Sequence, residues 1–263
     1  MNQPVRLAQL SRTEVADLAD EAVLVLPIGA TEQHGPHLPL GTDFLIVSEL
    51  VEQALTAAST TRPVVLAPTI PYGHSEHHVS AGGAGSMRPQ TLHLLLTDLI
   101  SSFVRTGFRR IMIINGHGGN DTAIRTVVAQ AGCDHPGVFA ALSYWHEAGT
   151  TPEGEIITEH KPGHAGQFEA SLLMALRPDV LPADRDIATG EPPAPMISGE
   201  DIGGGATVVR SGDWVTSGGW TDDPAGASPE LGAPYRDHLV QRLASAITGF
   251  CEISAPRPPG TAH

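Results

Sequence analysis

Short apolar runs alternate with segments of helical spacing along most of this chain, and this alternation restricts the fold more than any other feature. The apolar runs cover residues 22–28, 62–70, 109–116 and 137–145, and the helical segments cover residues 43–58, 91–107, 120–132 and 164–178. Gly107, Gly132 and Pro178 are expected to end three of these helices. Strand–helix repetition predicts a mainly parallel sheet with helices on both faces. We therefore expect an α/β fold, arranged as a three-layer α/β/α sandwich.

Three further segments fall outside this repeat. A short N-terminal helix is expected over residues 11–21, with Ser11 or Thr13 available as its cap. Residues 182–233 are rich in Gly, Pro, Ser and Asp and are too long for a plain connector, so we expect a lid, an active-site wall or a subunit contact there. A final helix is expected over residues 235–252.

The charge balance argues against two classes of partner. The 263 residues include 15 Lys and Arg against 29 Asp and Glu, a net charge of −14. An acidic surface repels phosphate backbones and anionic lipid, so we expect no nucleic-acid and no membrane-surface binding. Cys133 and Cys251 are far apart without a CxxC motif, which excludes a cysteine-built zinc site. With a polar N-terminal segment and no membrane-length apolar run, the chain is expected to be cytoplasmic.

Side chains that can bind metals or protons gather after the predicted strands. The first strand is followed by TEQHGPHLPLGTD, which holds Glu32, His34, His37 and Asp43. The later strands are followed by PYGHSEHH (residues 71–78), NGHGGN (residues 115–120) and the pair Trp145 and His146. Because the carboxyl ends of parallel strands share one edge of the sheet, we expect these loops to form one site.

The first loop has the residue types of a metal site. Glu32 and His34 are two positions apart, so extended backbone turns both to the same side. Carboxylate and imidazole ligands suit zinc, manganese or iron better than calcium or magnesium. The alternative is a polar loop in which Asp43 caps the following helix. His117 is likewise a ligand or a hydrogen-bonded structural histidine, and flanking glycines such as Gly118 let a ligand approach the backbone.

The helical segment 164–178 carries a carboxylate on an apolar face. Glu169 shares that face with Leu172 and Leu173, and a buried carboxylate needs its charge compensated. A metal ion would compensate it; the alternative is stabilisation by the dipole at the helix N-terminus. His164, just before the helix, is placed either to transfer protons or to cap the helix.

Aromatic and histidine-rich segments are candidates for the substrate pocket. Trp145 fits either a flat wall for a planar substrate or ordinary core packing. Residues 211–224, SGDWVTSGGWTDDP, are candidates to close the pocket. The sequence leaves the roles of His37, His74 and His77 open. It contains no phosphate-binding loop and no nucleophile elbow.

Four segments together resemble the creatininase (creatinine amidohydrolase) family, in the branch that carries NGHGGN. They are LPIGATEQHGPHLPLGTD, PYGHSEHH, RRIMIINGHGGN and HAGQFEASLLMALRP, in the family's order within residues 20–180. The resemblance implies one creatininase-like α/β/α domain over residues 1–252, a two-metal centre, a homohexamer and hydrolysis of small amides. Residues 253–263 are expected to be a disordered tail.

The resemblance also implies roles for individual residues. The implied metal ligands are Glu32, His34, Asp43, His117 and Glu169, with the aspartate bridging two divalent ions, zinc or manganese first and iron as a further option. Creatinine hydrolases have another metal-binding glutamate where this chain has Gly119, so Glu169 would take that role. A metal-held hydroxide would attack the amide carbonyl, and His164 would protonate the departing nitrogen. The implied substrate-binding residues are Ser75, His78, Trp145 and Gly118.

One segment departs from the family pattern and leaves the substrate open. In YGHSEHHVSAGGAGS, His77 replaces a glutamate and Ala84 a threonine, and this segment shapes the pocket in relatives. The first hypothesis is an amidohydrolase that acts on C–N bonds other than peptide bonds, in a creatinine-like cyclic amide. The second is a formamide or short-peptide hydrolase, including one that processes a cofactor precursor. From other classes, the alternatives are a noncatalytic metal-binding protein and metal-assisted C–C hydrolysis or isomerisation of a sugar-like ketone.

Overall fold

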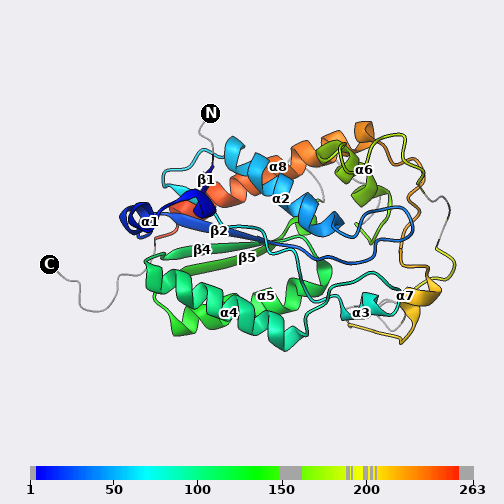
Figure 1. Ribbon diagram of the computed structural model, residues 1–263, viewed down its shortest axis with the longest axis horizontal. Coiled ribbons are helices and arrows are strands. Elements are labelled where there is room, and N and C mark those ends of the chain that lie inside the picture. Colours follow the sequence, from blue (N-terminus) through cyan, green and yellow to red (C-terminus); the bar gives the residue numbers. More distant parts are fainter. Residues whose placement is uncertain are drawn as a thin grey trace.

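The described part of the chain is built on one parallel sheet. The computed structural model describes residues 4–148, 162–187, 190, 192–197, 201, 204 and 206–254. Its strands are β1 (Val5–Arg6), β2 (Val23–Ile28), β3 (Val64–Leu66), β4 (Arg110–Asn115) and β5 (Val138–Ser143). They form a five-stranded sheet in the order β1-β3-β2-β4-β5, with every pair parallel (Figure 1). The expected α/β fold is confirmed, and β1 is a strand that the sequence pattern did not predict.

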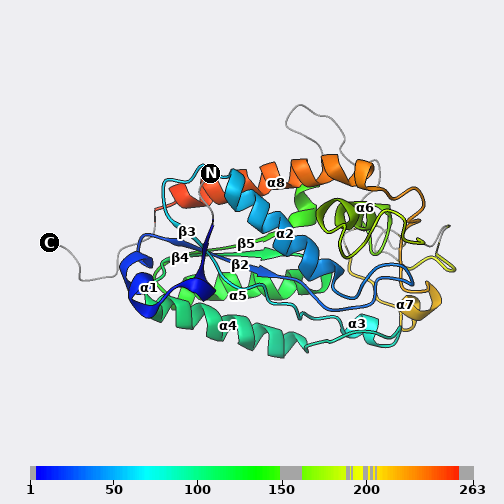
Figure 2. The ribbon, with the colours of Figure 1, turned by 45° about the horizontal axis from the view of Figure 1, so that its top comes forward.

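Helices cover both faces of this sheet. The α-helices are α1 (Arg12–Leu18), α2 (Thr42–Ala57), α3 (Glu76–Val79), α4 (Pro89–Thr106), α5 (Asp121–Asp134), α6 (Gln167–Leu176), α7 (Asp213–Thr216) and α8 (Pro229–Glu252). The 3-10 helices are η1 (Leu7–Gln9), η2 (Gly118–Asn120) and η3 (Tyr144–Glu147). Helices α2, α6 and α8 lie on one side of the sheet and α4 and α5 on the other, which gives the three layers (Figures 1 and 2).

The central strand β2 shows why its sequence is apolar at every position. All six of its residues are buried. Val23 and Val25 pack into the core formed with α2, α6 and α8, whereas Leu24, Leu26 and Ile28 pack into the core formed with α4 and α5. A strand covered on both faces has no solvent side, so polar alternation is lost.

Several helix boundaries differ from the prediction, among them the end of α5 and the start of α8. Helix α5 does not end at Gly132 but continues to Asp134, because Gly132 does not take a left-handed φ and the N–H of His135 still donates to the carbonyl of Ala131. Helix α8 begins six residues earlier than expected, at Pro229 rather than at residue 235. Ser228 caps it, and a proline at the first helical position costs no hydrogen bond. The N-cap prediction for Ser11 is confirmed by a complete capping box at α1.

The stretch 182–233 is irregular in its described part except for α7 and the start of α8. Helix α7 lies at the same end of the molecule as α3 (Figure 1). Residues 255–263, most of the expected tail, lie outside the described residues. Within the described ranges, none of the helices combines the length and the apolar character needed to span a membrane.

Candidate metal centre

Two neighbouring strands and two helices, α2 and α6, bring the candidate ligands together. Ile28 at the end of β2 pairs with Asn115 at the end of β4, so the loops that follow leave the sheet side by side. The N-terminus of α2 packs directly on these strand ends, since a Cβ on Gly29 would lie 2.5 Å from the backbone nitrogen of Phe44. This close approach, which only glycine permits, delivers Asp43 to the same place.

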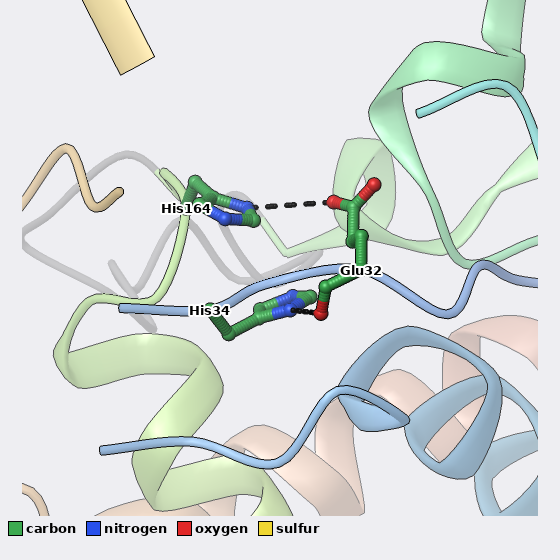
Figure 3. A group of neighbouring side chains, drawn as sticks. All are labelled: Glu32, His34 and His164. Carbon is green, nitrogen blue, oxygen red and sulfur yellow. Dashed lines mark hydrogen bonds and ion pairs between the residues drawn. The ribbon is translucent and has the colours of Figure 1, made fainter. Parts of the chain in front are cut away.

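The first group of candidate ligands surrounds His34. Its Nε2 lies 3.1 Å from Asp43 Oδ1 and 3.9 Å from Glu169 Oε2. Its Nδ1–H donates to the backbone carbonyl of Glu32 at 3.1 Å (Figure 3). This hydrogen bond leaves the Nε2 lone pair facing the two carboxylates, which is how metal-binding histidines are commonly oriented. His34, Asp43 and Glu169 therefore form a first candidate subsite.

A second group surrounds His117. Its Nδ1 lies 3.0 Å from Asp43 Oδ2 and 3.2 Å from Glu32 Oε1. Its Nε2–H donates to the backbone carbonyl of His74 at 2.9 Å, so the lone pair of Nδ1 faces the carboxylates. His77 lies close enough to Glu32 and His117 to add a further ligand atom. The two oxygens of Asp43 thus face two different histidines, the arrangement of a bridging carboxylate.

The carboxylates at this centre are buried and incompletely paired. Glu32, Asp43 and Glu169 are 0%, 3% and 8% exposed. Both carboxylate oxygens of Glu32 and Oδ2 of Asp43 have no hydrogen-bond partner in the described structure, although histidine nitrogens approach them closely. Three buried carboxylates need positive charge. With imidazole nitrogens beside them, these residues fit a divalent metal such as zinc, manganese or iron.

The shifted pKa values of the histidines and of Glu169 also indicate that the buried carboxylates need positive charge beside them. Burial opposes the charged form of His34, but Asp43 and then Glu169 outweigh it and raise the pKa of His34 to about 9. The pKa of His117 is raised well above its usual value because Glu32 and Asp43 outweigh burial. Burial raises the pKa of Glu169 to about 7, against the attraction of His34. Without metal, the protons on His34 and His117 balance the charge of the carboxylates. A metal cation would compete with these protons for the lone pairs of the imidazole nitrogens.

His164 faces this centre with one free nitrogen. Its Nε2–H donates to the backbone carbonyl of Gln33 at 2.9 Å, and its Nδ1 lies 3.7 Å from Glu32 Oε1 (Figure 3). Burial, and next the nearby His34, lowers the pKa of His164 well below its usual value. With Nε2–H donating to Gln33, the lone pair of the neutral ring is on Nδ1 and is directed at the candidate ligands, where a group could accept and return a proton.

Gln33 is a residue of the centre that the sequence did not single out. Its side-chain amide donates to His78 Nδ1 at 2.7 Å, and its Oε1 accepts from the backbone N–H of Gly35 at 3.0 Å. The other nitrogen of His78, Nε2, lies 3.1 Å from Glu32 Oε1. Gln33 therefore fixes the tautomer of His78. The only signal in the sequence was its place between Glu32 and His34.

The role of His37, left open by the sequence, is to brace the turn before α6. Its Nε2–H donates to the carbonyl of Ala165 at 2.8 Å. Ala165 has a left-handed φ of 57°, which is costly for a residue with a Cβ, and its N–H donates to Glu169 Oε2 at 2.6 Å. His37, in the first loop, therefore stabilises the turn between His164 and the helix that carries Glu169.

A cavity of about 810 Å³ opens onto the carboxylates. Of the expected substrate-binding residues, His78, Trp145 and Gly118 line it. Ser75 is fully buried, and its Oγ lies 3.4 Å from His117 Nε2, on the side of that ring away from the carboxylates. From the segment 211–224, it is Trp214 that brings its aromatic side chain into the lining.

Gly119 occupies a position with no room for a side chain. A Cβ there would lie 2.1 Å from the backbone carbonyl oxygen of His74 and 2.5 Å from His117 Nε2. The ligand that the resemblance assigns to this position in creatinine hydrolases cannot stand there in this backbone. Glu169, reaching the centre from α6, supplies a carboxylate instead.

A family model, curated relatives and solved structures all relate this chain to the same group of proteins. A family model described as creatinine amidohydrolase matches residues 8–247. A mycofactocin precursor peptide peptidase of Mycolicibacterium smegmatis is 33% identical over 71% of each chain, and a creatinine amidohydrolase of Pseudomonas putida is 31% identical over 67% of this chain and 72% of its own. A manganese creatininase structure and a mutant creatininase of the Zn-Zn type align over 95% and 96% of this chain and all of their own, with TM-scores of 0.74 and 0.71 and identities of 25% and 26%.

Proposed function

Because this chain belongs to the creatininase family, whose hydrolases are metal-dependent amidohydrolases, we propose that it hydrolyses a C–N bond of a small amide at a two-metal centre. The observation that carries the proposal is the position of Asp43 between two histidines, since one of its oxygens faces His34 and the other His117. Glu169 would complete the first subsite and Glu32 the second. Zinc and manganese are the metals of choice, since both occur in solved creatininase structures.

His164 is placed to take part in both proton transfers of the proposed reaction. A divalent pair, when bound, supplies a water of lowered pKa and polarises the amide carbonyl. His164 Nδ1, on the same side as Glu32, would take the proton of the attacking water and deliver it to the departing nitrogen. Gln33 holds the opposite nitrogen of His164 through its backbone carbonyl, which keeps this tautomer. The open cavity favours catalysis over a closed structural metal site.

Two substrate classes are compatible with this chemistry. A creatinine-like cyclic amide is the first hypothesis from the sequence. A short peptide is the second, and two observations favour it. The cavity of about 810 Å³ is in the upper part of the range for small-molecule pockets, more than a single small ring needs. The relatives at 32–33% identity include peptidases that act on a peptide precursor.

The test measures metal and activity on the same preparations. Protein purified without chelator is expected to contain close to two metal ions per chain, and Glu169→Gln is expected to retain about one. Metal-loaded protein is then assayed against creatinine and a panel of dipeptides, with chelator-treated protein as the control. Absence of metal in the wild type, or amide hydrolysis that survives chelation, would refute the proposal.

The resemblance further implies a homohexamer, and the polar N-terminal segment and cysteine usage predict a cytoplasmic location. Both remain predictions. Sedimentation velocity on the purified chain measures the first, with a single species of six chains as the expected result.

A further inference from the structure

Trp214 in α7 lies against three imidazoles at the edge of the metal centre. Its ring centroid is 4.0 Å from that of His78, 5.0 Å from that of His164 and 5.5 Å from that of His77. The indole is half-buried and lines the cavity. Trp220, the other tryptophan of this segment, is no part of the cavity lining; its ring is edge-on to His37 at 6.4 Å.

The segment around Trp214 is tied to the candidate proton-transfer group. The hydroxyl of Thr221 accepts from the backbone N–H of His164 at 2.7 Å, and the Thr221 N–H donates to the carbonyl of His164 at 3.0 Å. The buried carboxylate of Asp213 accepts from Arg210 Nε at 2.5 Å and from the N–H of Ile197 at 3.3 Å. The segment that carries the indole is therefore hydrogen-bonded to the backbone of His164 through Thr221, and Asp213 beside the indole is itself hydrogen-bonded.

The cavity lining combines charged and apolar side chains. Its polar lining includes the carboxylates of the metal centre and the histidines beside them. Its apolar lining from the irregular segment consists of Met196, Ile197, Val208, Val209 and Trp214. An apolar wall beside a charged reaction centre suits a substrate whose scissile amide carries an apolar group on one side.

We propose that Trp214 is a specificity-determining residue, the wall of a subsite for an apolar and preferably aromatic side chain on the departing amine of the substrate. The inference rests on the proposed function, in which His164 protonates the departing nitrogen. The indole contacts His164, so a substituent on that nitrogen would reach it first. An indole face offers a large apolar area and pairs well with another ring. The substrate class is then an amide or short peptide whose released amine bears a bulky apolar group.

The test compares dipeptides that differ only in their side chains. Glycyl-L-phenylalanine, L-phenylalanylglycine and glycylglycine are hydrolysed by zinc-loaded wild type, Trp214→Ala, Trp214→Phe and the matched control Trp220→Phe. The wild type is expected to prefer glycyl-L-phenylalanine. Trp214→Ala is expected to lower its kcat/KM about ten-fold relative to glycylglycine, mainly through KM, while Trp214→Phe keeps most of the preference. Metal content and melting temperature are expected to stay unchanged, which a merely structural role would not allow.

A binding measurement decides the inference even without turnover. The chain has three tryptophans, so the emission of Trp214 is taken as the difference between Trp220→Phe and the same variant with Trp214→Phe, which leaves Trp145 in place. Glycyl-L-phenylalanine is expected to change its emission saturably, and glycylglycine is not. A preference for L-phenylalanylglycine, an unchanged preference in Trp214→Ala, or no saturable change in emission overturns the assignment of Trp214. Failure of all three dipeptides as substrates, with the emission change intact, counts against the proposed function alone.

Discussion

Replacing Glu169 by glutamine should have opposite effects on the metal-free and the metal-loaded protein. Glu169 is 8% exposed on α6 and shares its surroundings with two other carboxylates. Glutamine has the same shape, keeps an oxygen for the hydrogen bond from Ala165 N–H, and removes the charge. A buried carboxylate placed to bind metal lowers the free energy of unfolding of the metal-free protein, whereas a carboxylate with a structural role raises it.

The size of the effect follows from the pKa of the carboxyl. Burial raises the pKa of Glu169 from its usual 4.5 to about 7. A raised carboxyl pKa means that the folded protein holds the proton more tightly than the unfolded chain, so stability falls as the pH rises from 4.5 towards 7. At 1.36 kcal/mol per pKa unit, the ionised group costs the metal-free protein about 3 kcal/mol above pH 7.

The assay is urea unfolding with chelator present, at pH 4.5 and pH 8. Glu169→Gln should match the wild type near pH 4.5 and exceed its free energy of unfolding by about 3 kcal/mol at pH 8. With zinc at a thousand times its Kd the order should reverse, because the additional site of the wild type then contributes about 4.1 kcal/mol, more than the ionised carboxylate costs.

Glu230→Gln is a matched control, since Glu230 also lies in the first turn of a helix but is exposed. That change should lower stability slightly at pH 8, by about 0.3–1 kcal/mol, through loss of the favourable helix-dipole interaction. If Glu169→Gln behaves like this control, with a small loss at pH 8 and no reversal by zinc, then Glu169 is an ordinary helix residue and the two-metal assignment fails.

Four further predictions concern the surroundings of the centre. Gln33→Ala should lower kcat about 10–100-fold with metal content little changed, because it frees the ring of His78; kinetics and metal analysis on one sample check this. His37→Ala leaves the Ala165 carbonyl unpaired and should cost about 1–3 kcal/mol in urea unfolding, with His37→Asn recovering part if the hydrogen bond is the cause. Gly119→Ala should destabilise the protein by more than about 2 kcal/mol, since its Cβ meets backbone; an unchanged melting curve would show that this loop adapts. Zinc binding at pH 7 should release about two protons, from His34 and His117, seen as a dependence of the binding enthalpy on buffer ionisation.

Most of the layered fold could be read from the sequence because it depends on local rules. Residues 22–28 are apolar at every position, and only a strand covered on both faces requires this. The capping box at Ser11 is likewise local. The errors arose where local signals conflicted with packing. Gly132 looks like a helix end, but its φ is not left-handed in the folded chain, so α5 continues to Asp134.

The chemical content of the site was also in the sequence. Carboxylates and histidines after successive strands predict a metal site, because parallel strands end at one edge of the sheet. Glu169 on an apolar helix face called for a compensating charge, and the structure places it 3.9 Å from His34 Nε2. These inferences needed only residue type, spacing and the cost of burying a charge.

What only the tertiary structure decided is which atom faces which. The orientation of each imidazole depends on backbone carbonyls far away in sequence: the histidine at 117 bonds the carbonyl of His74, and His37 bonds that of Ala165. The contact of Trp214 with His164 joins positions 50 residues apart across an irregular segment that has no periodic pattern to read. Hydrogen-bond direction and ring contact are set by three-dimensional packing, and residue spacing along a chain carries no record of them.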